Sequence, residues 1–423
     1  MAVASSRPEG YDRARPVQVL TLATLAQVAA SAAQQGLIVL VVFFRVIDHL
    51  SLVAMGGVAA SVTFGTMVGM IPSGAVVDRM GVARGAVVGC LGLVACLVGL
   101  YLATPAPVDV LVVLLAGVGA FAASMPVAGA RAVLAAFPAA QRGMAMGIRQ
   151  SGVTIGAALA AALLPTLALL WGLRDVILIL AAPVAVFGAA LARSVAALPS
   201  PAREVGRTAD GAARARGGAR TIALISIAGA LLAAGQYDTL AYAITYLHAS
   251  LGMRVALAGG VLAAAQVGGT LSRVGIGLLS DRLGIGRAHA VAGLAALGCV
   301  GLTLFSLVSS PTYALWLGLA FILGTGAIGW NALILTWAAE NAASAQQATA
   351  IGVSGAAIFL GATVFPPVFG AVASATGSLP DAWRSVALLY VIATALCLLI
   401  ARSAAGSGVP ARRSAKPARA AGG

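Results

Sequence analysis

Charged residues are what this sequence lacks most. They make up 9% of its 423 residues, while 61% are hydrophobic and the mean hydropathy is +1.01. Soluble domains carry roughly 25% charged residues, so a chain with so little charge cannot cover itself with polar groups in water. The composition excludes a soluble globular protein and indicates a membrane protein.

Cysteine and histidine are also scarce, which excludes several kinds of site. The four cysteines lie inside apolar runs without a CxxC spacing, so we expect them to pack as small side chains. The three histidines, His49, His248 and His289, fall at predicted helix ends without a partnered nucleophile or a metal-ligand spacing. The sequence therefore predicts no enzyme active site, no metal and no cofactor.

The alternating pattern of a membrane β-barrel strand is absent too, because the apolar runs are continuous. Runs of about 20 apolar residues can cross a bilayer as helices. Twelve spans are predicted, at residues 17–44, 50–72, 85–103, 108–132, 143–168, 173–193, 221–248, 255–280, 288–309, 312–339, 346–373 and 380–401. The predicted fold class is an all-α integral membrane protein.

The net charge of +14 does not indicate nucleic-acid binding, because the charges lie in short loops and tails. With the N-terminus inside, 20 of the 26 Lys and Arg residues fall on the cytoplasmic side; only Arg45, Arg174, Arg254 and Arg384 fall outside. This bias predicts that both termini are cytoplasmic. The polar segment 1–16 does not resemble a cleavable signal peptide and is predicted to be a cytoplasmic tail.

Two six-helix halves are expected on either side of a linker. Residues 194–220 are rich in Pro, Gly, Ala and Arg and predict a mobile cytoplasmic linker. It separates predicted bundles at 17–193 and 221–401. Residues 402–423 are basic and predict a disordered tail.

An internal repeat relates the two halves. The string GAVVDRMGVAR (74–84) matches GLLSDRLGIGR (277–287) at an offset of 203. The string AMGIRQSGVTIG (145–156) matches AIGVSGAAIFLG (350–361) at an offset of 205. Two matches at nearly one offset indicate a duplicated six-helix unit, as in transporters with a central site between two bundles.

The repeated string resembles the signature of the major facilitator superfamily of twelve-helix transporters, G-x-x-x-D-R-x-G-x-x-R between helices 2 and 3, with a partial copy between helices 8 and 9. The matching positions are Gly74, Asp78, Arg79, Gly81 and Arg84, then Gly277, Asp281, Arg282, Gly284 and Arg287. The resemblance covers nearly the whole chain. It implies two pseudo-symmetric bundles and a transport function.

Both copies of the string are predicted to act as a conformational gate. A loop aspartate can accept hydrogen bonds from the N-terminus of a neighbouring helix, where free N–H groups and the dipole favour an anion. Nearby arginines can pair with that carboxylate, and the glycines allow tight turns and close helix approach. Such a contact would stabilise one arrangement of the bundles. The alternative is that these charges only set topology.

Two arginines inside the spans are candidates for substrate binding, since ionisable groups in a membrane are costly and usually functional. Arg149 lies about 10 Å inside helix 5, and Arg273 about 12 Å inside helix 8, at 1.5 Å per residue. Aimed into a cavity, they would bind an anionic substrate. The alternative is that they snorkel towards the cytoplasm as part of the gate.

Two acids are candidates for proton coupling. Asp238 lies well inside helix 7, and Glu340 at the cytoplasmic end of helix 10. Burial in a low dielectric favours the protonated form of a carboxyl group, which suits a proton carrier. The alternative for Asp238 is a structural hydrogen bond to Tyr242 or Gln236.

Polar and small residues at helical spacing form stripes that should face the interior of the bundle, because lipid offers no hydrogen-bond partners. One such stripe in helix 5 contains Arg149, Gly152 and Gly156. The other candidate substrate-binding residues are Gln27 and Gln34 in helix 1, Tyr242 in helix 7, Gln266 in helix 8 and Asn331 in helix 10.

Three departures from the family pattern weigh against a drug-efflux mechanism. Helix 4 (LLAGVGAFAASMP) lacks the arginine common in proton-coupled members, helix 5 (SGVTIGAAL) lacks the proline of drug–proton antiporters, and helix 1 has glutamines where they carry an acid. The strings GMAMGIRQSGVTIGAAL and GWNALILTWAAENA resemble prokaryotic cyanate and organic-anion permeases.

The prediction is a secondary active transporter of a small organic or inorganic anion, such as a carboxylate, working by rocker-switch alternating access in a bacterial inner membrane. Its expected partners are the substrate, a co-transported proton and the lipid bilayer, and the expected state is a monomer. A drug or metabolite exporter on the same fold (a proton antiporter) stays open, as does, more remotely, a transporter-like sensor.

Overall fold

The computed structural model describes residues 14–47, 52–196, 210–310 and 312–406. Within these ranges the chain forms α-helices joined by short turns and two single-turn 3-10 helices, and it contains no strand. Twelve stretches are long and apolar enough to cross a membrane, the first at Pro16–Val39 and the last at Leu379–Ser403. The predicted all-α membrane fold with twelve spans is confirmed.

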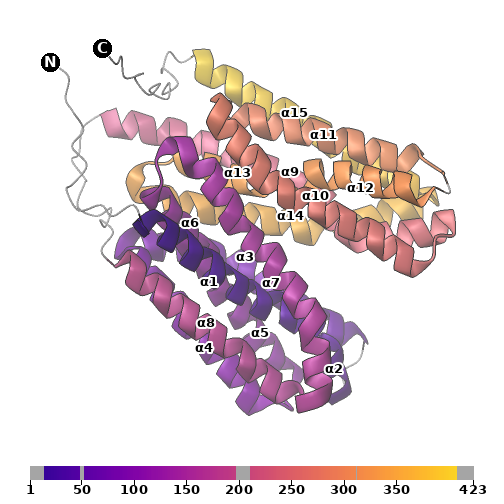
Figure 1. Ribbon diagram of the computed structural model, residues 1–423, viewed down its shortest axis with the longest axis horizontal. Helices are drawn as coiled ribbons and strands as arrows, with labels where there is room; N and C mark the ends of the chain where they lie inside the picture. Colours follow the sequence, from indigo (N-terminus) through magenta and orange to yellow (C-terminus); the bar gives the residue numbers. More distant parts are fainter. Residues whose placement is uncertain (1–13, 48–51, 197–209, 311, 407–423) are drawn as a thin grey trace, which may run out of the picture. The chain divides into compact units, whose positions relative to one another are not determined.

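Eight of the described helices precede residue 197 and seven follow residue 209 (Figure 1). The first eight are α1 (Ala14–Val39), α2 (Val41–Ile47), α3 (Leu52–Met80), α4 (Val82–Ala103), α5 (Val108–Ala122), α6 (Ser124–Ala136), α7 (Arg142–Trp171) and α8 (Leu173–Val195). The other seven are α9 (Asp210–Leu251), α10 (Val255–Leu283), α11 (Arg287–Leu307), α12 (Tyr313–Ile328), α13 (Asn331–Glu340), α14 (Gln347–Thr376) and α15 (Leu379–Gly406).

Two predicted spans are single crossings made of two helices. Ala123 separates α5 from α6, and the turn at Gly329 and Trp330 separates α12 from α13. The indole N–H of Trp330 donates a hydrogen bond to the carbonyl oxygen of Ala327 at 2.7 Å, which covers an acceptor next to the second break. Both breaks fall in the fourth span of a six-helix half, so the two halves share this feature.

The two repeated strings are more helical than the span boundaries predicted. α3 runs through Asp78 to Met80, and α4 follows after the single residue Gly81, whose φ is 89°. α10 likewise ends at Leu283, and Gly284 has a φ of 65°. Side chains with a Cβ rarely adopt positive φ, so each glycine ends its helix while the aspartate stays in the last helical turn.

The predicted linker also proved partly helical. α9 begins at Asp210, about ten residues before the expected boundary. The segment DGAARARGGAR has an aspartate in its first turn and is rich in alanine and arginine, which favour helix. Residues 197–209 lie outside the described residues. α15 extends to Gly406, so the predicted tail starts as helix and the rest of it lies outside the description.

Residue contacts divide the chain into two units that each take a segment from the opposite half. Unit 1 comprises Met1–Phe137, Ile148–Ala209 and Ala342–Ala356; unit 2 comprises Pro138–Gly147, Asp210–Asn341 and Ala357–Gly423. The first turns of α7 therefore belong to unit 2 and those of α14 to unit 1. Both helices are continuous across the division.

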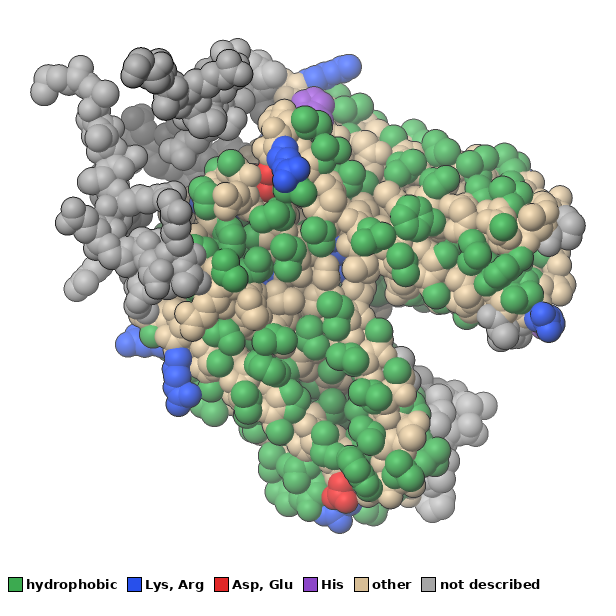
Figure 2. All heavy atoms as spheres, viewed as in Figure 1, with side chains coloured by type: hydrophobic (Ala, Val, Ile, Leu, Met, Phe, Trp, Pro, Cys, Tyr) green, Lys and Arg blue, Asp and Glu red, His purple; other side chains and the backbone are tan. Residues whose placement is uncertain are grey.

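Apolar side chains cover much of the face seen in Figure 2. Leu169, Val113 and Leu102 are 78%, 69% and 68% exposed. Exposed aliphatic side chains of this kind suit a helix surface that contacts lipid. Polar side chains are concentrated inside instead, with Arg149, Asp238 and others almost wholly buried.

Candidate functional site

In unit 1, the first repeated string binds the start of α14. The carboxylate of Asp78 accepts hydrogen bonds from the backbone N–H groups of Ala348, at 3.0 Å, and Thr349, at 2.7 Å. These are the second and third residues of α14, whose N–H groups have no partner within their own helix. The contact predicted between a loop aspartate and a helix N-terminus is confirmed here, with Asp78 only 8% exposed.

Gly74 explains how α3 comes so close to α14. A Cβ at this position would lie 2.6 Å from the carbonyl oxygen of Ala348 and 2.7 Å from the Cα of Thr349, both backbone atoms that cannot rotate away. Because Gly74 is one helical turn before Asp78, its close approach brings the carboxylate to the helix start.

The arginines of this first copy do not pair as expected. Arg79 and Arg84 are exposed, and neither forms an ion pair with Asp78 within the described part of the chain. The expected arginine–carboxylate pairing is therefore wrong for unit 1. Asp78 is buried and accepts two backbone hydrogen bonds, whereas both guanidinium groups are exposed to solvent, where an ion pair contributes little.

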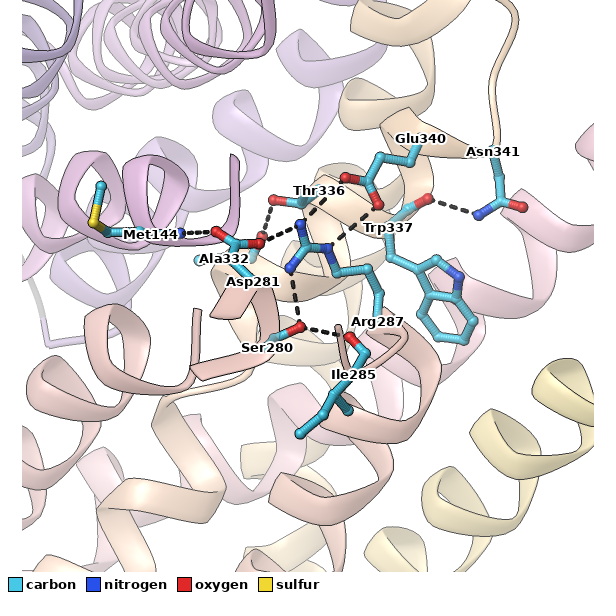
Figure 3. Close-up of polar contacts among 10 residues, drawn as sticks. All are labelled: Met144, Ser280, Asp281, Ile285, Arg287, Ala332, Thr336, Trp337, Glu340 and Asn341. Atoms are coloured by element: carbon cyan, nitrogen blue, oxygen red, sulfur yellow. Dashed lines mark hydrogen bonds and ion pairs between the residues drawn. The ribbon is translucent and has the colours of Figure 1, made fainter. Parts of the chain in front are cut away.

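In unit 2, the second repeated string builds a larger charged cluster (Figure 3). Asp281 accepts a hydrogen bond from the backbone N–H of Met144, the third residue of α7, at 2.9 Å. Arg287 lies between two acids, 2.8 Å from Asp281 and 3.3 Å from Glu340. It also donates to the hydroxyl of Ser280 at 3.0 Å. Here the predicted arginine–carboxylate pairing is confirmed.

The rest of the second copy matches the first. Gly277 packs directly on the backbone of Gly143 at the start of α7, as Gly74 packs on α14. Arg282, the counterpart of Arg79, is exposed and forms no ion pair within the described residues. Arg282 and Arg79 therefore share only a solvent-exposed position.

Unit 1 contains a buried arginine held by amides. Arg149 has no exposed surface, and it donates hydrogen bonds to the side-chain oxygens of Gln27, at 3.0 Å, and Gln150, at 2.6 Å. Gln27 in turn donates to Ser31 at 3.0 Å. The amides of Gln27 and Gln150 are neutral, so these two bonds orient the guanidinium charge without neutralising it.

The stripe of Arg149, Gly152 and Gly156 in α7 packs against α1, so it faces the inside of unit 1. Gly152 packs on Gln27 and on the backbone of Thr24, and Gly156 on the backbone of Val28. Gln34, further along α1, is only half-buried and donates to the hydroxyl of Thr66 in α3 at 2.6 Å. The structure thus brings Arg149 and Gln27 together and places Gln34 in a separate contact.

Unit 2 contains a buried carboxyl and a buried arginine. Asp238 is 1% exposed, and neither of its carboxyl oxygens has a hydrogen-bond donor among the described residues. Arg273 is 2% exposed and donates to the carbonyl oxygen of Ile328, beside the break between α12 and α13, at 3.2 Å. The alternative of a hydrogen bond from Tyr242 or Gln236 to Asp238 is not realised.

The remaining candidates in unit 2 are spread over several contacts. Tyr242 donates to the carbonyl oxygen of Pro366 at 2.8 Å and stacks on Phe369, with ring centroids 4.5 Å apart. Gln266 is half-buried on α10, and Asn331 is 8% exposed at the start of α13. Glu340 lies in the cluster with Arg287.

Sequence reasoning missed three polar partners. Gln150 follows Arg149 directly, so it lies off the polar stripe of α7 that contains Arg149. Thr66 lies in α3, a helix for which no polar stripe was predicted. Arg131 was placed at the end of the predicted span 108–132 and given no polar contact, but α6 extends past it, and its guanidinium donates to the carbonyl oxygen of Ser344 at 3.2 Å.

No group of three His, Cys, Asp or Glu side chains within the described ranges is placed to hold a metal ion. The described residues therefore offer hydrogen bonds and ion pairs at helix starts, together with buried charges inside the bundles. A sequence comparison decides what kind of protein uses them. The model of the Major Facilitator Superfamily matches residues 23–366.

The chain belongs to the Major Facilitator Superfamily. It is accordingly a multi-pass membrane transporter and not an enzyme. No match to a curated protein sequence is significant.

Solved structures of superfamily transporters share the fold. The E. coli fucose:proton symporter FucP has a TM-score of 0.71 at 16% identity, covering 92% of this chain and 99% of that one. The proton:xylose symporter XylE, bound to 6-bromo-6-deoxy-D-glucose, has a TM-score of 0.70 at 16% identity, covering 91% and 96%. The human organic anion transporter MFSD10 (TETRAN) has a TM-score of 0.68 at 14% identity, covering 90% and 99%.

Proposed function

We propose that this transporter moves a small organic or inorganic anion, such as a carboxylate, by rocker-switch alternating access. The observation that carries the proposal is a pair of buried arginines, Arg149 in unit 1 and Arg273 in unit 2, on membrane-spanning helices. A buried guanidinium is costly to retain unless it is used. Guanidinium groups bind carboxylates through paired, charge-assisted hydrogen bonds.

Arg149 is the stronger of the two substrate-binding candidates. Gln27 and Gln150 orient its guanidinium, and their neutral amides can give way to a charged ligand in a state that opens the site. Arg273 is tied to the backbone of α12 at Ile328 and would respond to movement of the α12–α13 break. We expect Gln34, Tyr242, Gln266 and Asn331 to contribute polar contacts.

We further propose that Asp238 carries a coupling proton. A buried carboxyl group without a hydrogen-bond donor is far cheaper to retain in its neutral form than in its charged form. A group that must be neutral when buried and can ionise when water reaches it is suited to carry a proton. FucP and XylE are described as proton symporters, which makes coupling of this kind compatible with the fold. Glu340, tied to Arg287, remains the second candidate for coupling.

A ligand screen followed by transport tests the anion proposal. Purified protein is screened by thermal shift against carboxylates, cyanate, nitrate and cationic drugs, and uptake of the stabilising compound is measured in proteoliposomes. Arg149→Ala should weaken transport of an anion about 10- to 100-fold, the loss of one charge-assisted contact. Arg384→Gln, which changes an exposed arginine, is the control. Stabilisation by hydrophobic cations alone, with normal transport by Arg149→Ala, would favour the exporter alternative.

The proton proposal has its own test. Asp238→Asn should abolish accumulation driven by a pH gradient while exchange of substrate across the membrane, which needs no gradient, continues. Gradient-driven accumulation that persists in Asp238→Asn would remove this residue from coupling.

A further inference from the structure

An apolar groove on unit 1 ends at two arginines. It lies at one end of α4 and α8, with a volume of about 490 Å³. Its walls include Val87 and Val88 from α4 and Ala189 and Ala192 from α8, and Arg84 and Arg193 lie at its rim. The distribution of Lys and Arg assigns this end of the helices to the cytoplasm.

Small side chains leave the groove open at this end of α4 and α8, and the two helices pack together further along. In the middle of the pair, the thiol of Cys90 donates to the carbonyl oxygen of Val184 at 3.4 Å. A Cβ on Gly188 would lie 2.7 Å from the sulfur of Cys90, so the two helices are in close contact there. Towards the cytoplasmic end α8 presents alanines, whose short side chains leave the space between the helices unfilled.

The groove combines a surface suited to acyl chains with the positive charge of two arginines. Val87 and Val88 are each 41% exposed, as side chains facing lipid are. Among the described residues, no acid lines the groove, and neither Arg84 nor Arg193 forms an ion pair with another of these residues. The acid nearest to Arg84 in the sequence, Asp78, accepts hydrogen bonds from the start of α14.

Helical spacing places charge and apolar wall on the same faces. Val87 and Val88 are three and four residues after Arg84, and Ala189 is four residues before Arg193. Residues at these spacings share one side of a helix. Each helix therefore presents an apolar strip that leads up to an arginine at the cytoplasmic end.

We propose that this groove binds an anionic phospholipid of the cytoplasmic leaflet, with an acyl chain between α4 and α8 and the phosphate on Arg84 and Arg193. Basic pockets between membrane helices on this side recognise anionic head groups, and guanidinium pairs suit phosphate. A zwitterionic lipid would bring its own cation towards two arginines, so charge complementarity selects the anionic one. This also gives Arg84 a partner that its own loop does not supply.

The test is a lipid titration of the purified full-length chain, followed by native mass spectrometry. Phosphatidylglycerol should bind more tightly than phosphatidylcholine with the same acyl chains. Arg84→Gln and Arg193→Gln should each weaken phosphatidylglycerol binding about fivefold, and the double variant about 30-fold. Arg282→Gln, an exposed cytoplasmic arginine outside the groove, should leave it unchanged.

The acyl part of the site is tested separately. Val88→Trp should fill the groove and weaken binding of phosphatidylglycerol while both arginines are present. Soluble glycerol phosphate, which has the head-group charge without the chains, should not compete. The proposal is overturned by equal binding of the two lipids, by unchanged binding in the double arginine variant or in Val88→Trp, or by effective competition from glycerol phosphate.

Discussion

The two copies of the repeated string use the same backbone contact and different charges. Asp78 in unit 1 accepts two hydrogen bonds at the start of α14, and Asp281 in unit 2 accepts one at the start of α7. Arg287 then joins Asp281 to Glu340, whereas its counterpart Arg84 is exposed. Duplication has retained the helix-start contact in both halves and arginine pairing in one.

A single position accounts for much of this difference. The offset of 205 residues places Ala135 at the position of Glu340. An arginine shared by two acids is held in place, while an arginine facing one acid that is already occupied gains little by pairing. The charge cluster of unit 2 thus depends on Glu340 as much as on the repeated string itself.

The largest effect should come from the glycines, because both copies need them. Gly74→Ala and Gly277→Ala each place a Cβ against backbone atoms, and such overpacking should cost about 3 kcal/mol and lower the thermal unfolding midpoint. Gly275→Ala is the matched control, since a Cβ there meets nothing within 4 Å. Equal midpoints for all three variants would contradict the close approach.

Substitution of the two aspartates should have the next largest effect, and the effect should be larger for Asp78 than for Asp281. Asp78→Asn removes a charge from two helix-start hydrogen bonds and should shift the conformational balance by about 2 kcal/mol, or about 30-fold. Asp281→Asn should shift it less, because Arg287 keeps Glu340 as a partner. Labelling rates of single cysteines in α7 and α14 measure both shifts. A larger effect from Asp281→Asn would reverse the comparison.

The arginines should separate the two copies most clearly. Arg287→Gln breaks contacts to two acids in a site where the arginine side chain is 10% exposed, and should cost about 1.5 kcal/mol. Arg84→Gln, measured in neutral detergent without anionic lipid, should leave the unfolding midpoint unchanged. Similar losses for the two variants would mean that Arg84 has a structural partner after all.

The smallest effect should come from restoring the missing acid. Ala135→Glu should recruit Arg84 and stabilise unit 1 by about 0.5 kcal/mol, the usual size for an exposed pair. A double-mutant cycle with Arg84→Gln isolates that coupling. The same variant should weaken phosphatidylglycerol binding. A coupling of zero, with lipid binding unchanged, would show that residue 135 is not the counterpart of Glu340.

The fold was predictable because hydropathy and the repeat report directly on it. Continuous apolar runs located all twelve spans, and helix-start binding by Asp78 followed from the signature and the dipole of a helix N-terminus. Hydropathy missed the helical ends of α3 and α10 and the start of α9. Those segments are polar but still form helix, because helix propensity and capping do not depend on a membrane.

The site was less predictable, because hydrogen-bond partners depend on the rotation of each helix about its axis and on the depth of each residue in the bundle. Helical spacing placed Arg149 and Gln27 on stripes expected to face the bundle interior, and the two side chains form a hydrogen bond. It gave no sign of Gln150, which is adjacent in sequence, or of the pairing between Glu340 and Arg287 across 53 residues. It left open the possibility that Tyr242 bonds to Asp238, and Tyr242 bonds to α14 instead.

The contact between Asp78 and the start of α14 should open and close during transport. The most direct measurement is the distance between spin labels at Arg79→Cys and Gln346→Cys, both exposed positions, by pulsed electron resonance in a background without the native cysteines. We predict one dominant short distance, and a second, longer population that grows when Asp78→Asn is added. An unchanged distance distribution in Asp78→Asn would contradict the claim.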